Sequence, residues 1–152
     1  MNESRLNLHA TGVVLGRRGY LIMGPSGSGK SQLAHLLLEN ARQNGLFAAL
    51  VADDRVWLEA RGGRVIASRP QTIAGLMEIR FSGLVTVPSL DAAVIDAVVL
   101  SVEPSSMTER LPQSAESRCF FPGQSLPVLR LCPAHHPSVA GLQRLLEAWA
   151  SD

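Results

Sequence analysis

The sequence predicts a mixed α/β fold: a phosphate-loop nucleotide-binding core with a mixed sheet, forming one domain over residues 1–152. Three observations support this class: a phosphate-loop motif between a strand pattern and a helix pattern, a strand-rich middle, and an amphipathic pattern near the end of the chain. A single strong helix followed by several strands is not the regular βαβα alternation of a doubly wound sheet. A chain of 152 residues suits one hydrophobic core.

The phosphate-loop motif occupies residues 24–31, and it matches the pattern G-x-x-x-x-G-K-[ST] at every fixed position. Its glycines allow successive backbone N–H groups to turn toward phosphate oxygens. Lys30 would then reach the β- and γ-phosphates, and Ser31 would offer a hydroxyl to Mg²⁺. A turn without a ligand is the alternative, but the strand before the motif and the helix after it favour a nucleoside triphosphate site. The expected nucleotide-binding residues are Gly24, Pro25, Ser26, Gly27, Ser28, Gly29, Lys30 and Ser31.

The elements around the motif follow from apolar periodicity. Residues 11–15 and 20–23 are predicted strands joined by a turn at 16–19. Apolar residues at helical spacing predict a helix over 31–44, which Asn44-Gly45 ends. The unbroken apolar run 46–52 predicts a central strand buried on both faces. Because this strand leads directly into Asp53 and Asp54, it resembles a Walker B element.

The second half of the chain is predicted to consist mainly of short strands. Residues 56–59 and 65–67 predict a hairpin with a turn at 61–64. Further strands are expected at 84–87, 93–102 and 127–131, with an exposed loop at 103–118. A final amphipathic helix is predicted over 139–150.

Composition and charge exclude several classes of protein. With 46% hydrophobic and 18% charged residues, the chain has the composition of a compact soluble protein. The net charge is +1 without a basic stripe, so we expect no nucleic-acid partner. We identify neither a signal peptide nor an apolar run long enough for a membrane span. Cys119 and Cys132 have no metal-type spacing and indicate a reduced, cytoplasmic protein, although a disulfide between them stays open.

Further chemistry-bearing residues accompany the phosphate loop: His9, the pair Asp53 and Asp54, Glu78 with Arg80, and Arg110. Phosphoryl transfer needs a metal to bridge the phosphates, a group to take a hydroxyl proton, and cations for the developing charge. These side chains could supply each of them. Their plainer interpretations are solvated acids at a strand end, a structural histidine, a surface ion pair and a solvated loop arginine.

The order of these motifs resembles the catalytic domain of the HPr kinase/phosphorylase family. His9 stands fifteen residues before Gly24, as that family's histidine does, and residues 51–56 resemble its acidic-pair motif. Residues 77–85, Met-Glu-Ile-Arg-Phe-Ser-Gly-Leu-Val, are similar to the family signature L-E-I-R-G-L-G-I-I. The resemblance covers residues 6–131, and it implies the family's PEP carboxykinase-like fold and its use of ATP and Mg²⁺.

The resemblance implies a role for each acidic residue. Asp53 matches the catalytic carboxylate that takes a proton from the HPr serine in the kinase direction. In the phosphorylase direction, where phosphate attacks phosphoserine, the same group returns a proton. Asp54, Ser31 and Glu78 match residues on the metal side.

Three basic residues match the rest of the family's catalytic set. His9 and Arg80 correspond to side chains that hold the transferred phosphoryl group and the acids, and Arg110 corresponds to a mobile-loop arginine. The chain differs from the signature at Phe81-Ser82, where the family has Gly-Leu. About eight residues precede His9, which suggests the short form without the N-terminal regulatory domain.

The sequence thus predicts an ATP- and Mg²⁺-dependent serine kinase for an HPr-type phosphocarrier protein of a bacterial phosphotransferase system, with phosphorylase activity left open. The resemblance also implies a homo-oligomer, a hexamer in the family. Two other hypotheses stay open. One is a small-molecule kinase or ATPase on the same core, and the other is a regulatory nucleotide-binding module without catalysis.

Overall fold

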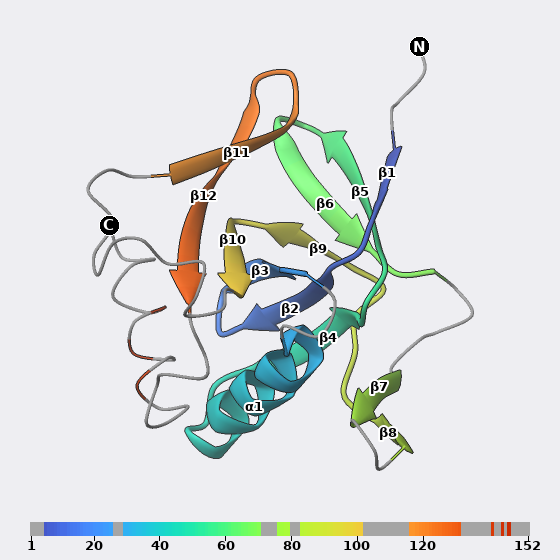
Figure 1. Ribbon diagram of the computed structural model, residues 1–152, viewed down its shortest axis with the longest axis vertical. Helices are drawn as coiled ribbons and strands as arrows, with labels where there is room; N and C mark the ends of the chain where they lie inside the picture. The colour runs from blue at the N-terminus through green and yellow to red at the C-terminus, as the bar shows by residue number, and fades with distance from the viewer. Residues whose placement is uncertain are drawn as a thin grey trace.

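The computed structural model describes residues 5–25, 29–70, 76–79, 83–101 and 116–131, together with Gly141, Arg144 and Leu146. Within these residues the chain forms a six-stranded sheet, a four-stranded sheet and a two-stranded hairpin, with helix α1 (Lys30–Gln43) against the larger sheet (Figure 1). No helix in the described part of the chain is long and apolar enough to cross a bilayer. The mixed α/β class predicted from the sequence is therefore confirmed.

The six-stranded sheet is mixed, as the sequence predicts. Its strands β10, β3 and β12 run parallel, whereas β11 is antiparallel to β12, and β2 is antiparallel to both β3 and β4. The order across the sheet is β11 (Glu116–Phe121), β12 (Gln124–Leu131), β10 (Ala97–Ser101), β3 (Arg18–Met23), β2 (Thr11–Leu15) and β4 (Ala48–Ala52).

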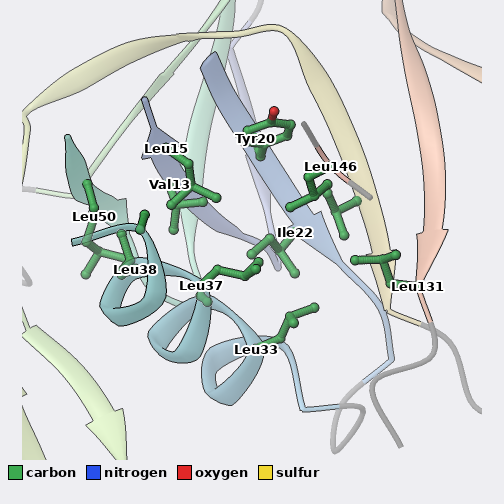
Figure 2. Close-up of a cluster of buried hydrophobic side chains, with 14 of the residues drawn as sticks. Val13, Leu15, Tyr20, Ile22, Leu33, Leu37, Leu38, Leu50, Leu131 and Leu146 are labelled. Carbon is green, nitrogen blue, oxygen red and sulfur yellow. The ribbon is translucent and has the colours of Figure 1, made fainter. Parts of the chain in front are cut away.

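Helix α1 packs on the six-stranded sheet through the apolar stripe that predicts it. The buried stripe repeats every three or four residues, which places its members on one side of a helix. The helix ends as expected, since Asn44 donates a side-chain hydrogen bond to the Asn40 carbonyl and Gly45 takes a φ of +76°. Figure 2 shows the resulting cluster, in which α1 contributes Leu33, Leu37 and Leu38, and the sheet contributes Val13, Leu15, Tyr20, Ile22, Leu50 and Leu131.

A four-stranded antiparallel sheet covers the other face of the larger sheet. Its order is β1 (Arg5–Leu8), β5 (Val56–Arg61), β6 (Arg64–Ser68) and β9 (Ala92–Ile95), and β5 and β6 form the predicted hairpin. A second apolar cluster fills the space between the sheets, with Leu21 and Val98 from the larger sheet and Leu58 and Val65 from the smaller one. The hairpin of β7 (Leu76–Ile79) and β8 (Gly83–Thr86) contacts α1.

The predicted strand 93–102 is wrong, because this segment forms two strands in different sheets. β9 pairs with β6, whereas β10 pairs with β3 and β12, and Asp96 lies between them. The backbone of Asp96 donates to the Gly19 carbonyl at 2.8 Å, and its carboxylate accepts from the Gly19 amide at 2.9 Å. These contacts form only in the tertiary structure, so apolar periodicity could not locate the break.

The apolar strand before the acidic pair lies at the edge of its sheet, not at the centre as predicted. β4 starts at Ala48, and all five of its residues are buried because α1 and the smaller sheet cover its two faces. A chain segment protects its outer edge: Leu50 donates to the Pro88 carbonyl and accepts from the Leu90 amide, each at 2.9 Å. Strong burial on both faces explains why the sequence resembles that of a central strand.

The predicted loop 103–118 is also wrong at its end, because residues 116–118 belong to β11, while 103–115 lie outside the described residues. Glu116 of β11 and Arg130 of β12 form a bidentate pair across the strands. The hydrogen bond with Arg130 lowers the pKa of Glu116. Cys119 is a free thiol, and Cys132 lies outside the described part, as does most of the predicted final helix.

Candidate functional site

The candidate site lies beside the strand ends of the large sheet, where β3 and β4 end and β2 begins. Because β2 is antiparallel to both neighbours, β3 and β4 run in the same direction, and their carboxyl ends lie on either side of the start of β2. Gly24 and Pro25 follow β3, and Gly29 precedes α1 with a φ of +86°, in the left-handed region that favours glycine. Lys30 is the first residue of α1 and is 8% exposed. Ser26, Gly27 and Ser28 lie outside the described residues.

The residue after the loop lysine contacts the first acid of the pair. Ser31 Oγ donates a hydrogen bond of 2.6 Å to Asp53 Oδ1. A second hydroxyl reaches the same oxygen, since Thr11 Oγ1 donates to Asp53 Oδ1 at 3.0 Å. The start of α1, the end of β4 and the start of β2 are thus joined at one carboxylate oxygen.

A β-bulge explains why Asp53 faces α1. The register of β4 against β2 pairs Gly12 with Ala52 but the next residue of β2 with Leu50, so Val51 is an extra residue. Leu50 accordingly packs in the cluster under α1, while Val51 and Ala52 both pack in the cluster toward the smaller sheet. Since side chains otherwise alternate between faces, this one-residue shift returns Asp53 to the α1 face.

The second acid of the pair has different surroundings. Asp54 has a φ of +68°, and it is the one non-glycine residue with positive φ in the described part of the chain. Its amide donates to Thr11 Oγ1 at 3.2 Å, and its carboxylate Oδ1 lies 3.5 Å from His9 Nδ1. The His9 and Asp54 side chains are 69% and 60% exposed, so this pair faces solvent. Ser31, expected beside the metal, therefore contacts Asp53, while Asp54 contacts His9.

The remaining predicted residues are only partly placed. Glu78 belongs to β7, the strand that contacts α1. Arg80 and Arg110 lie outside the described residues. The contacts of these three side chains with the acidic pair stay predictions.

The residues matched to the phosphate loop and its metal are chemically suited to Mg²⁺. A serine hydroxyl and a carboxylate are hard oxygen ligands, and Mg²⁺ in nucleotide sites takes one or two protein carboxylates with phosphate oxygens and water. Within the part of the chain that the structure describes, no three His, Cys, Asp or Glu side chains gather as a metal cage. A Mg²⁺ ion that shares its coordination with phosphates does not need such a cage.

Comparison with known proteins identifies the family to which this domain belongs. Residues 3–102 match the family model described as HPr Serine kinase C-terminal domain. The chain belongs to this family. It is 37% identical over 86 residues to the HPr kinase/phosphorylase of Clostridium tetani, an alignment covering 55% of this chain and 26% of that protein. It is 34% identical over 109 residues to the HPr kinase/phosphorylase of Brevibacillus brevis, covering 65% of this chain and 33% of that protein.

The alignments thus span about a quarter to a third of the length of these curated HPr kinase/phosphorylases. The fold also matches a solved structure, that of the Hpr(Ser) kinase/phosphatase from Coxiella burnetii. The two chains superpose with a TM-score of 0.74 over 96% of this chain and 94% of the other, at 23% sequence identity. The HPr kinase C-terminal domain fold is therefore shown.

One residue that contacts the acidic pair in this HPr kinase-family domain was absent from the sequence prediction. Thr11 is fully buried and contacts both Asp53 and Asp54 through its hydroxyl. Its sequence signal is weak, because threonine is common in strands. A polar residue at the start of an otherwise apolar strand, two positions after His9, is the pattern that could have indicated it.

Proposed function

We propose that this domain is an ATP- and Mg²⁺-dependent serine kinase that phosphorylates an HPr-type phosphocarrier protein. The observation that carries the proposal is the 2.6 Å hydrogen bond from Ser31 to Asp53, which joins the end of the phosphate loop to the acid expected to accept the serine proton. Membership of the HPr Serine kinase C-terminal domain family supports the substrate. The names of the matched relatives support the reverse, phosphorylase reaction as a second activity.

In this proposal residues 24–31 bind the phosphates of ATP. The positive end of the α1 dipole favours negative charge where the loop ends. Lys30 binds the β- and γ-phosphates. Ser31 would hold Mg²⁺ together with the carboxylates of Asp54 and Glu78, which are the residues matched to that role. When bound, Mg²⁺ would neutralise charge on the phosphates.

The proton of the attacking serine hydroxyl passes to Asp53. Ser31 donates a hydrogen bond to this carboxylate, so Asp53 lies beside the last residue of the phosphate-loop motif. His9 lies beside Asp54 on the solvent side, from which a protein substrate can approach. Arg80 and Arg110 would bind the phosphoryl group as negative charge develops. By the family resemblance we expect a homo-oligomer, a hexamer, in the cytoplasm.

The test is transfer of labelled γ-phosphate from ATP to purified HPr, with the wild type, Asp53→Asn and Ser31→Ala. Loss of the general base should lower transfer by roughly 10²- to 10⁴-fold, and Asp53→Asn should still bind ATP. Glu39→Gln is the matched control, because Glu39 is an exposed carboxylate on α1 that pairs with Arg42. It should transfer phosphate like the wild type.

Two outcomes would replace the proposal. ATP binding without label on HPr would indicate a regulatory nucleotide-binding module. ATP hydrolysis at a rate that HPr does not change would indicate an ATPase or a small-molecule kinase. Label on a serine of HPr that Asp53→Asn abolishes would support both the activity and the role of Asp53.

A further inference from the structure

Thr11 is the buried residue that joins the two acids. Its exposed fraction is 0%, and its one hydroxyl makes a hydrogen bond to each of the two acidic residues. The hydroxyl donates to Asp53 Oδ1 at 3.0 Å and accepts from the Asp54 amide at 3.2 Å. A threonine hydroxyl has one proton to donate and lone pairs to accept, so both hydrogen bonds can form at once.

The contact with the Asp54 amide supports an unfavourable backbone conformation. A φ of +68° lies in the left-handed region, which aspartate adopts more readily than most residues with a Cβ but which still costs free energy that surrounding contacts must offset. The Asp54 amide is fixed by the Thr11 hydroxyl, and this turn of the chain directs the two carboxylates to different partners. The hydroxyl therefore acts on the orientation of both acids.

The Thr11 side chain is itself held rigidly. Thr11 pairs with Ile22 of β3 in the interior of the sheet, next to the strand that leads into the phosphate loop. Branching at Cβ restricts its χ1 angle further. A rigid strand thus sets the position of Asp53 relative to the loop, as precise catalytic geometry requires.

We propose that Thr11 is a positioning residue for the acidic pair: its hydroxyl holds Asp53 against Ser31 and fixes the backbone turn at Asp54. This inference rests on the proposed kinase function for its effect on rate. Valine has almost the shape of threonine without the hydroxyl, whereas serine keeps the hydroxyl. The two substitutions therefore separate hydrogen bonding from packing.

The kinetic test measures kcat and KM for ATP in phosphate transfer to HPr, with the full 152-residue chain. Thr11→Val should lower kcat about 100-fold, the effect of misplacing a reacting group by about 1 Å, and should leave the KM for ATP nearly unchanged. Thr11→Ser should restore most of the rate. Equal rates for Thr11→Val and the wild type, or an equal loss in Thr11→Ser, would overturn the inference.

Val13→Ala is the matched control for stability. Val13 lies on the same face of β2, is fully buried and packs in the cluster under α1. It should lower the unfolding temperature and leave kcat unchanged. If Thr11→Val does not fold, Thr11→Cys takes its place, since a thiol forms weaker hydrogen bonds.

A second measurement does not depend on the kinase. Hydrogen exchange of the Asp54 amide, followed by NMR on the chain alone, reports the contact with Thr11 directly. Exchange should be about tenfold faster in Thr11→Val, as expected for loss of one hydrogen bond, and near the wild-type rate in Thr11→Ser. Unchanged exchange in Thr11→Val would overturn the inference. If the wild type does not phosphorylate HPr, the proposed function fails, and the exchange rates still decide whether Thr11 holds the turn.

Discussion

Asp53 and Asp54 are neighbours in the chain but contact different groups. Asp53 accepts hydrogen bonds from Ser31 and Thr11, whereas Asp54 lies beside His9 at the surface. Two backbone features separate them: the extra residue in β4 and the positive φ of Asp54. Because adjacent carboxylates repel each other, directing them apart also reduces that repulsion.

The backbone of Asp54 can be tested by comparing two substitutions. Asp54→Gly and Asp54→Ala both remove the carboxylate, but only alanine keeps a Cβ at a φ of +68°. Asp54→Gly should therefore have the higher free energy of unfolding, by about 1 kcal/mol. Urea denaturation measures the difference. Equal stabilities would contradict the strain inferred at this position.

At the scale of elements, the six-stranded and four-stranded sheets come into direct backbone contact where β3 passes the end of β9. A Cβ added to Gly19 would lie 2.0 Å from the Val94 carbonyl oxygen, too close for any side chain. The reciprocal hydrogen bonds between Gly19 and Asp96 join the sheets at the same place. This crossing divides the apolar segment 92–101 between two sheets.

The crossing predicts that Gly19→Ala lowers the free energy of unfolding by about 3 kcal/mol or more, because backbone must move to admit the methyl group. Gly12→Ala is the control on the neighbouring strand. Its nearest contact would be the Val51 Cβ at 3.4 Å, and we expect a loss of about 0.5 kcal/mol. Thermal unfolding of both variants checks this. A loss at Gly19 as small as the one expected at Gly12 would show that the backbone here can move at little cost.

At the scale of the whole molecule, the six-stranded sheet carries an apolar cluster on each face. Leu37 of α1 belongs to the cluster on one side and Leu58 of β5 to the cluster on the other, and both are fully buried. Strands β2, β3, β4 and β10 contribute side chains to both clusters. Since the clusters share these strands, we expect the domain to unfold as one cooperative unit.

Leu37→Ala and Leu58→Ala should each reduce the free energy of unfolding by about 2–5 kcal/mol, through lost burial and a cavity. Each variant should still unfold in a single transition. Leu36→Ala is the control, since Leu36 lies on the same helix but is 37% exposed. It should change stability by about 0.5 kcal/mol or less. Two separate calorimetric transitions in either core variant would contradict the expectation that the two clusters unfold together.

Much of the fold could be predicted because local periodicity and turn chemistry specify it. The helix at 30–43, the two strands before the phosphate loop and the hairpin at 56–68 all follow from such patterns. The failures have a common cause. The break at Asp96 and the edge position of β4 depend on partners more than twenty residues away, which apolar periodicity does not contain.

The sequence by itself determined the family, the phosphate-loop motif and the acidic pair, because these depend on residue types at fixed spacing. Only the tertiary structure decided which acid contacts which group. The bulge at Val51 turns Asp53 toward α1, and antiparallel pairing brings Thr11 between the acids. Strand register and sheet order arise from long-range pairing, and they place side chains in space independently of their separation along the chain.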